Sequence, residues 1–426
     1  MCYAIPGRVV GVVEGVAEID YFGERKRALT DSAQVAVGDF VYAQAGLVVK
    51  KISEAEANAV QGYWEKALPE LREKDRELSS RSVGVNNWLE GVVNRAFAGA
   101  PPSAAEVEGL LRLDSPSDLS SLYSASNELR RLKLNNSCCV HAIIEFSNNC
   151  VNDCAYCGIR RSNAGMSRYK MSVSEVVSAA DYACNKLGFK SLVLQAGEGA
   201  YSVAELVETV ENVKKACGTV VFISVGELAS EDYAALWEVG ARGVLIRFET
   251  SDPTLYAELH SGQELGDRLE CIRDCRRQGY LIASGGLLGL PGQSLASIAR
   301  DILLAKELGT EMFSFGPFIP HPGTPLASCA KPSLNSVLKV LAASRLVELE
   351  SKILVTTALE KIAPDGRRRG FMSGANSFMI SATPSDYLSK YDLYPGKSLR
   401  DEVVAEVRAV QEFLKGIGRA PTDFGV

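Results

Sequence analysis

The first 60 residues alternate apolar and polar positions in short runs, the period-two pattern typical of half-buried strands. Turns that contain Gly7, Gly15, Gly23 and Gly38 separate these runs. We therefore predict a small all-β barrel whose strands lie at residues 8–13, 16–21, 25–29, 40–44 and 47–51.

From residue 54 the apolar positions recur every three or four residues, which is the period of an amphipathic helix. The last of these runs begins with Ser115 as a candidate N-cap and Pro116 at the first helical position. We interpret the region as a helical linker and barrel preface, with helices at residues 64–76, 85–97, 103–111 and 115–134.

From His141 onward short apolar runs alternate with longer amphipathic ones. Strands followed by crossover helices predict parallel pairing, and this length suits one (βα)8 barrel of the TIM type, with its chemistry at the carboxyl ends of the strands. The expected strands are residues 142–147, 191–195, 220–225, 243–248, 282–288, 312–318, 353–358 and 377–381. The expected helices are residues 172–187, 202–217, 230–239, 266–278, 294–308, 334–350 and 399–414. The predicted fold is therefore α/β, with domains at residues 1–62, 63–134 and 135–426.

Composition and charge narrow the class of protein. Apolar residues make up 46% of the chain and charged residues 23%, which is ordinary globular usage. The net charge of −6 disfavours nucleic acid or an anionic membrane as a partner. The first residues do not form a basic and then apolar leader, and no run approaches the length of a membrane helix, so we expect a cytoplasmic protein.

The 11 cysteines are an odd number scattered through a long chain, which favours free thiols in a reducing compartment. Three of them share one loop after the first strand of the (βα)8 barrel, in the order Cys150-Val-Asn-Asp-Cys154-Ala-Tyr-Cys157. Three thiolates can ligate three irons of a [4Fe-4S] cluster and leave the fourth iron open. A zinc site normally has four ligands and finds no spaced histidine here, while a redox dithiol of Cys154 and Cys157 leaves Cys150 unexplained.

This Cys-x3-Cys-x2-Cys spacing, with the aromatic Tyr156 before the third cysteine, resembles the signature of radical S-adenosylmethionine enzymes. The resemblance implies that the open iron binds S-adenosylmethionine and that one-electron reduction releases a 5′-deoxyadenosyl radical. The strand ends offer polar partners for such a zwitterion: Glu198, Ser224, Arg247 and Glu249, with Arg268 opening the next helix.

Further stretches resemble the hydrogenase maturase family HydE, whose near relatives are biotin synthase and methylornithine synthase. They include Leu-Gln-Ala-Gly-Glu198, Ile-Arg-Phe-Glu-Thr250 and Gly-Pro-Phe-Ile-Pro-His-Pro-Gly-Thr-Pro-Leu326. The resemblance implies that Ser224, Glu249 and Arg268 contact S-adenosylmethionine or substrate, and we assign Tyr156 and Glu198 to the cofactor site as well. It also implies that Arg247, Tyr391 and Tyr394 line the cavity.

That family resemblance implies an organometallic iron complex with cyanide, carbon monoxide and a cysteine ligand as substrate, attacked by the radical at sulfur. It further implies other hydrogenase maturation proteins as partners and a reducing electron donor. The sequence leaves open whether the hydrogenase that is matured is of the [FeFe] or the [NiFe] type.

The start of the chain, Met1-Cys-Tyr-Ala-Ile-Pro-Gly, resembles the HypC family of small hydrogenase-assembly chaperones. The resemblance implies that Cys2 becomes an exposed iron ligand once the initiator methionine is removed. A histidine is usual in that family where this chain has Gln44, so a simple docking module is the alternative.

Two other functions remain open at this point. One is a radical mutase or fragmentation enzyme that acts on an amino acid, and the other is a non-catalytic carrier of iron complexes. Residues 316–326 and the fused first domain favour a maturase over the mutase, and the intact cysteine trio argues against a non-catalytic carrier.

Overall fold

The computed structural model describes residues 4–31, 33–81, 86–395 and 403–421. Among these residues, no helix combines the length and the apolar character that crossing a bilayer requires. Cys2 lies outside the described residues.

The amino-terminal residues form a closed five-stranded β-barrel, so the predicted small barrel is confirmed. Its strands follow the order β1-β2-β3-β5-β4, and each begins and ends within about two residues of the expected position because the period-two pattern stops at the glycine turns. The strands are β1 Gly7–Val13, β2 Val16–Tyr21, β3 Glu24–Leu29, β4 Phe40–Gln44 and β5 Leu47–Ile52.

Four helices connect the two barrels: α1 Glu54–Leu78, α2 Asn87–Phe97, α3 Ala104–Arg112 and α4 Pro116–Leu134. The helix α1 begins ten residues earlier than expected, since the Ser53 hydroxyl caps it by accepting the Glu56 N–H at 3.2 Å. It runs without a break across residue 62. The domain limits at residues 62 and 134 stay a prediction.

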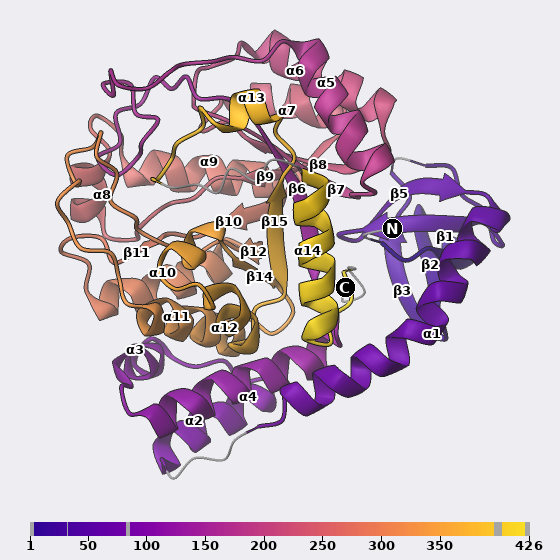
Figure 1. The fold of residues 1–426 in the computed structure, drawn as a ribbon, viewed down its shortest axis with the longest axis horizontal. Helices are drawn as coiled ribbons and strands as arrows, with labels where there is room; N and C mark the ends of the chain where they lie inside the picture. The colour runs from indigo at the N-terminus through magenta and orange to yellow at the C-terminus, as the bar shows by residue number, and fades with distance from the viewer. Residues whose placement is uncertain (1–3, 32, 82–85, 396–402, 422–426) are drawn as a thin grey trace.

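The rest of the chain forms a closed barrel of parallel strands, which confirms the predicted (βα)8 fold. Helices surround the strands in Figure 1. Around the barrel, the strands are β6 Cys139–Ser147, β7 Ser191–Ala196, β8 Val220–Ser224, β9 Ala241–Leu245, β10 Leu281–Ser284, β12 Thr310–Phe313, β14 Lys352–Val355 and β15 Ser377–Ser381.

Two expected strands are split in the structure. The runs at 282–288 and 312–318 each leave the barrel halfway, and their second parts, β11 Leu287–Leu288 and β13 Gly316–Pro317, pair in a separate two-stranded sheet. The two segments can leave the barrel side by side because residue 285 is glycine. A Cβ at this position would lie 2.5 Å from the Ser314 carbonyl oxygen.

The long barrel helices follow the predicted pattern, while three short ones were not predicted from periodicity. Ser172 and Ser202 begin two of the long helices with capping boxes. The long helices are α5 Val173–Asp181, α6 Val203–Ala216, α7 Ser230–Glu238, α9 Leu265–Arg277, α10 Leu295–Glu307, α11 Leu334–Val347 and α14 Val403–Gly416. The short ones are α8 Pro253–Leu259, α12 Gly366–Met372 and α13 Ser385–Leu388.

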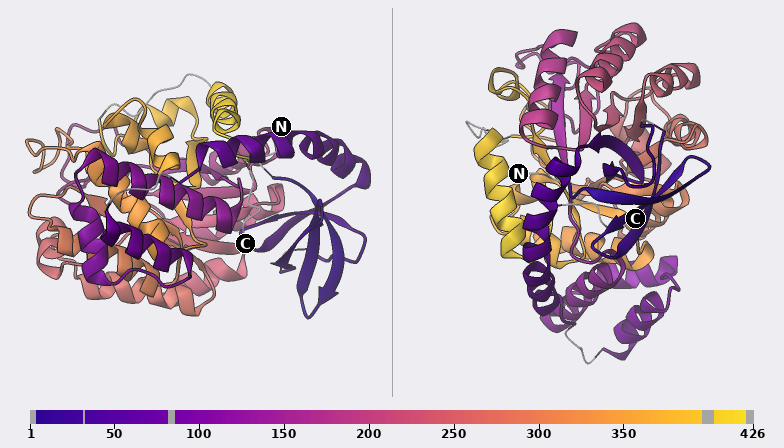
Figure 2. Two further views of the ribbon diagram at one scale, coloured as in Figure 1. Left: turned by 90° about the horizontal axis from the view of Figure 1, so that it is seen from below. Right: turned by 90° about the vertical axis from the view of Figure 1, so that its right-hand side faces the viewer.

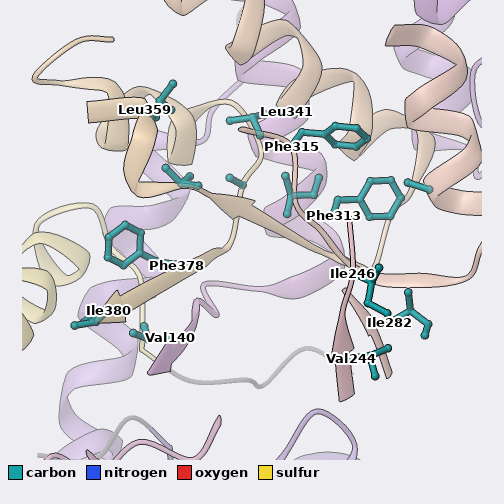
Figure 3. Close-up of a cluster of buried hydrophobic side chains, with 14 of the residues drawn as sticks. Val140, Val244, Ile246, Ile282, Phe313, Phe315, Leu341, Leu359, Phe378 and Ile380 are labelled. Carbon is teal, nitrogen blue, oxygen red and sulfur yellow. The ribbon is translucent and has the colours of Figure 1, made fainter. Parts of the chain in front are cut away.

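Side chains that point outward from the strands pack under the helices and form the main core. Figure 3 shows part of it, with Val244, Ile282 and Phe378 from strands and Leu341 from α11. This core holds the strands in register, so their carboxyl ends meet at one rim.

The small barrel packs against the amino ends of the large barrel's strands, and Figure 2 shows it to one side of the larger body, with α1 leading from one to the other. Gly218, just before β8, approaches the Val49 carbonyl so closely that a Cβ would lie 2.7 Å from the oxygen. The Lys190 ammonium, just before β7, lies 4.8 Å from the centre of the Tyr42 ring. The small barrel therefore covers the end of the large barrel opposite the expected site.

Candidate active site

A cavity of about 360 Å3 opens at the carboxyl ends of the barrel strands. Its floor consists of apolar side chains from the strands, among them Ile143, Leu245 and Met379. The structure brings together around it every predicted site residue that it describes: Cys150, Cys154, Cys157, Tyr156, Glu198, Ser224, Arg247, Glu249, Arg268, Tyr391 and Tyr394.

The cysteine loop leaves β6 and is fixed to its neighbours by backbone hydrogen bonds. The Val151 N–H donates to the Glu198 carbonyl at 3.0 Å, and the Ala155 N–H donates to the Leu259 carbonyl at 2.8 Å. Within the loop, Asp153 accepts a hydrogen bond from Arg160 at 2.7 Å, which holds the pKa of that carboxyl well below its usual range. The loop is thus set in place by protein contacts of its own.

Gly197 allows the cysteine loop to lie close to the end of β7. A Cβ at this position would stand 2.1 Å from the Asn149 carbonyl oxygen and 2.7 Å from the Cys150 Cβ. Only glycine fits such a contact without displacing backbone.

The three thiols share one partly buried space. Burial, and then the neighbouring Cys150, raise the pKa of the Cys154 thiol to about 12. Burial and Cys154 raise the pKa of Cys157 further. Thiolates crowded in this way need a strong compensating cation. In the described part of the chain, no three side chains converge closely enough to hold a single metal ion. A cubane cluster instead takes one thiolate on each iron. The three thiols of the cysteine loop therefore fit a [4Fe-4S] cluster.

Tyr156 is oriented by a histidine that the sequence reasoning did not single out. His260 Nδ1 donates to the Tyr256 carbonyl at 3.0 Å, so Nε2 is the acceptor and the Tyr156 hydroxyl donates to it at 3.0 Å. Burial lowers the pKa of His260 to about 4, which keeps the ring neutral near pH 7. The hydrogen bond therefore persists across the physiological pH range.

Glu227, just after β8, contacts both Glu198 and Arg268. Glu198 accepts the Glu227 N–H at 3.1 Å, and Gly226 makes room because a Cβ there would lie 2.1 Å from Glu198 Oε2. The Arg268 guanidinium lies 2.5 Å from the Glu227 carboxylate. Arg268, on α9, thus pairs with this residue after β8 rather than with the adjacent Asp267.

Arg247 and Glu249 form an ion pair of 2.7 Å on the cavity wall. Glu249 has a φ of 65°, a left-handed conformation that is rare outside glycine. Its backbone is held there by a hydrogen bond to Gly285 at 3.1 Å and one from Leu287 at 3.1 Å. Such strain is typical of functional positions.

The two tyrosines from the segment after α13 close another side of the cavity. The Gln195 amide donates to the Tyr391 hydroxyl at 2.7 Å, and the Tyr394 hydroxyl lies 2.6 Å from the Thr357 hydroxyl. Burial raises the pKa of Tyr394 to about 12, so it stays protonated. Gln195 and Thr357 were missed from sequence, although Gln195 occupies an inward position at a strand end, which is where the other site residues lie.

Comparison with known proteins identifies the class. Residues 144–305 match the Radical SAM superfamily, and residues 1–64 match the HupF/HypC family. The chain is 37% identical over 301 residues to the [FeFe] hydrogenase maturase subunit HydE of Thermotoga maritima, across 70% of this chain and 86% of that protein. The 3-methylornithine synthase of Methanosarcina acetivorans is 30% identical over 78% of this chain and 94% of its own length.

A crystal structure of methylornithine synthase superposes with a TM-score of 0.68 at 26% identity, covering 78% of this chain and 97% of that one. The barrel and its cysteine loop define a radical S-adenosylmethionine enzyme, a class that uses a [4Fe-4S] cluster and S-adenosylmethionine. Within that class the chain belongs to the HydE family, and it carries a HypC-like domain at its amino terminus. This membership favours an enzyme over a non-catalytic carrier.

Proposed function

We propose that the protein is a hydrogenase maturase that uses a 5′-deoxyadenosyl radical to attack an organometallic iron complex bearing cyanide, carbon monoxide and cysteine. The observation that carries the proposal is the set of three thiols, carboxylates and arginines around one cavity with an apolar floor. The relationship to HydE supports it.

Cys150, Cys154 and Cys157 would hold the [4Fe-4S] cluster, which when bound and reduced would supply the electron for cleavage of S-adenosylmethionine. The carboxylates of Glu198 and Glu249 suit the ammonium and ribose groups of that molecule. The carboxylate of S-adenosylmethionine suits the Arg268 guanidinium, because a bidentate charge-assisted pair is strong in a site that excludes most water.

Two further residues complete this side of the cavity. Ser224, at the end of β8, offers a hydroxyl to the ribose. Tyr156 presents its ring, held by His260, to the adenine side. The protein's contribution is position and the exclusion of water, since the radical chemistry belongs to the cofactor.

Arg247, Tyr391 and Tyr394 would bind the iron complex itself. An anionic complex is attracted to the Arg247 guanidinium, and an apolar floor strengthens that attraction by excluding water. The tyrosines stay neutral and donate hydrogen bonds, so they add no opposing charge.

The first domain, which we place at residues 1–62, would deliver or accept the iron unit through Cys2. A tether raises the effective concentration of cargo near the barrel. A reducing donor and the other hydrogenase maturation proteins would act with it in the cytoplasm, where cysteines stay reduced.

The test is anaerobic reconstitution followed by incubation with S-adenosylmethionine, dithionite and a synthetic cysteine-ligated iron dicarbonyl cyanide complex. We expect an adenosyl-thioether product by mass spectrometry. Cys154→Ala abolishes it, while Cys184→Ala, which removes a buried thiol that does not line the cavity, does not. A cluster that does not cleave S-adenosylmethionine reductively overturns the proposal, and unchanged maturation by Cys2→Ala overturns delivery through that thiol.

A second candidate is an amino-acid mutase, favoured by the 30% identity to 3-methylornithine synthase over 94% of that enzyme. Incubation with lysine under the same reducing conditions separates the two. A rearranged amino acid supports the mutase, and unconverted lysine beside an adenosyl-thioether supports the maturase.

A further inference from the structure

The outer face of the cysteine loop is the side of the cluster site that lies open to solvent. Val151 directly follows Cys150 in the chain, yet it is 52% exposed. Helices surround the strands of the large barrel, and the small barrel covers their amino ends (Figures 1 and 2). A partner that must come close to the three thiols without entering the cavity therefore approaches across this loop.

Positive charge gathers on the loop and on the chain that follows it. Residues 148–170 contain four cationic side chains and one carboxylate, so their net charge apart from the thiols is +3, whereas the whole chain carries −6. Two of the four cations form ion pairs, one with Asp153 inside the segment and one with Glu205 outside it. The other two, Arg161 and Arg168, give this surface its positive charge.

Arg161 and Lys390 are exposed cations that backbone hydrogen bonds hold beside the loop. The Arg161 N–H donates to the Asn152 carbonyl at 2.8 Å, in the middle of the loop. The Lys390 carbonyl accepts the Asn148 side-chain amide at 2.8 Å, just before the loop begins. Among the described residues, neither cationic side chain lies within 4.0 Å of a carboxylate oxygen. Both charges are therefore available to an acidic partner.

Arg168 adds positive charge beneath this face. Its guanidinium donates to the backbone carbonyls of Asn148, Ile159 and Arg160 at 2.5, 2.8 and 2.6 Å. These acceptors carry no net charge, so the field of the guanidinium is not cancelled by them. The same hydrogen bonds join the start of the cysteine loop to the segment after it. The surface is therefore preformed, and docking a partner orders little chain.

The chemistry of the enzyme class requires a surface of this kind. Each reductive cleavage of S-adenosylmethionine consumes one electron, and the donor's redox centre must come close to the cluster to deliver it. Opposite charges speed the encounter of two proteins, and electron-transfer interfaces are small, which allows the oxidised carrier to leave. An iron–sulfur centre exchanges single electrons at low potential, as this reduction needs.

We propose that Val151, Arg161 and Lys390, with Arg168 beneath them, form a docking face for a small acidic protein that carries single electrons on an iron–sulfur cluster. One electron leaves the carrier, which is oxidised, and reduces the cluster that the three thiols hold; no bond forms or breaks in this step. Val151 supplies an apolar contact beside the charges. The inference rests on the enzyme class and on the reducing donor of the proposed function, and not on the iron-complex substrate.

The test measures binding of a plant-type [2Fe-2S] ferredoxin to the full-length reconstituted protein by fluorescence anisotropy. We expect the affinity to fall as salt rises from about 50 to 500 mM. Arg161→Glu and Lys390→Glu should each raise the Kd about tenfold at low salt, because each places like charges opposite one another. Both substitutions keep the backbone groups that hold these positions. Lys133→Glu makes the same charge change at the end of α4, close to the amino end of β6, and keeps wild-type affinity.

A second measurement compares two electron sources. With reduced ferredoxin below saturation, Arg161→Glu and Lys390→Glu should release 5′-deoxyadenosine about tenfold more slowly than the wild type, in line with their weaker binding. With dithionite, a small reductant that needs no docking, the rates of the variants and the wild type should agree.

Equal ferredoxin affinity in all variants overturns the docking face. So does wild-type binding that does not weaken with salt, a measurement that does not depend on the folding of any variant. An acidic flavin-carrying protein that binds where the ferredoxin does not overturns the choice of partner. Failure of the proposed function is distinguishable, because ferredoxin-driven release of 5′-deoxyadenosine without an adenosyl-thioether removes the iron-complex substrate and leaves the docking face.

Discussion

His321 Nε2 donates a hydrogen bond to the Asp392 carboxylate at 3.1 Å. The proton is on Nε2 because Nδ1 accepts the Gly323 N–H at 3.0 Å. Beside this pair, Gly158 next to the cysteine loop donates to the Leu393 carbonyl at 3.1 Å. The segment that carries the two cavity tyrosines is therefore fastened directly to the loop that carries the thiols.

Asp392→Ala is expected to loosen this segment. Losing one hydrogen bond of about 1 kcal/mol raises the KM for the iron complex about fivefold, while the affinity for S-adenosylmethionine changes little. Steady-state kinetics and calorimetry measure the two quantities. Asp386→Ala removes an exposed carboxylate of the nearby α13 and serves as the control. Equal KM values for the two variants contradict the idea.

Gly197→Ala is expected to prevent proper loading of the cluster. The added methyl group meets the Asn149 carbonyl and Cys150, and the overlap costs about 1–3 kcal/mol unless the loop moves. We expect less iron and sulfide per chain after reconstitution, with an unchanged circular dichroism spectrum. Gly266→Ala, where the new methyl group has no neighbour within 4 Å, keeps the wild-type iron content. Full loading of the Gly197 variant argues against this role.

Most of the fold could be predicted from the sequence because its signals are local. The period-two runs between glycines gave the small barrel, and the βα alternation gave the large one. The site followed from one topological rule, since Glu198, Ser224 and Arg247 all lie at the carboxyl ends of parallel strands.

The features that could not be predicted depend on contacts between distant segments. Glu249 adopts its left-handed conformation because residues 285–287 hold its backbone, and its own sequence neighbourhood carries no signal for this. To predict the hydrogen bond from the Gln44 amide to the Cys139 sulfur, one must know which end of the large barrel the small barrel covers. Hydrophobic periodicity shows which face of a helix or strand is buried, but it does not show which other element packs against that face.

Arg247→Gln is expected to weaken binding of an anionic iron complex. A hydrogen bond to a charged group contributes about 1.5–3 kcal/mol, so the KM for the complex rises between about tenfold and a hundredfold. Cleavage of S-adenosylmethionine without the complex continues, measured as released 5′-deoxyadenosine. Arg300→Gln, which alters a side chain 59% exposed, is the control. An unchanged KM shows that Arg247 does not bind the substrate.

Asp301 makes the stability of the barrel depend on pH. Its carboxylate accepts the Ser251 N–H at 2.6 Å beside Glu249, and burial raises its pKa from 3.8 to about 6. The folded chain therefore binds this proton more tightly than the unfolded chain does. The resulting stabilisation is complete below about pH 4 and is lost as pH rises through about 6.

Asp301→Asn removes this dependence. The difference in unfolding free energy between wild type and variant should change by up to about 3 kcal/mol between pH 4 and 7, in the direction that favours the variant at pH 7. Urea titrations at several pH values measure it, and comparison of the two proteins cancels the other titrating groups. A difference that stays constant with pH contradicts the assignment.

Asp75 joins three parts of the chain through buried charge. Its carboxylate accepts two hydrogen bonds from Arg130, at 2.6 and 2.7 Å, and one from Arg419 at 3.1 Å. All three side chains are at most 1% exposed. Burial and the charges of these two arginines also lower the pKa of the nearby Arg345 to about 9. One carboxylate thus offsets the two buried arginines, and the three side chains link α1, α4 and the chain after α14.

Asp75→Asn is expected to cost about 3–5 kcal/mol, because it leaves two guanidinium groups buried without their counter-ion. For a chain of 426 residues the entropy of unfolding is about 0.9 kcal/mol/K, so we expect a fall in Tm of about 3–6 °C, measured by circular dichroism. Asp274→Asn breaks an exposed pair with Arg277 and should change stability by no more than about 1 kcal/mol. If the two variants melt together, the buried charges are compensated by the surrounding carbonyl groups, and Asp75 is not the anchor.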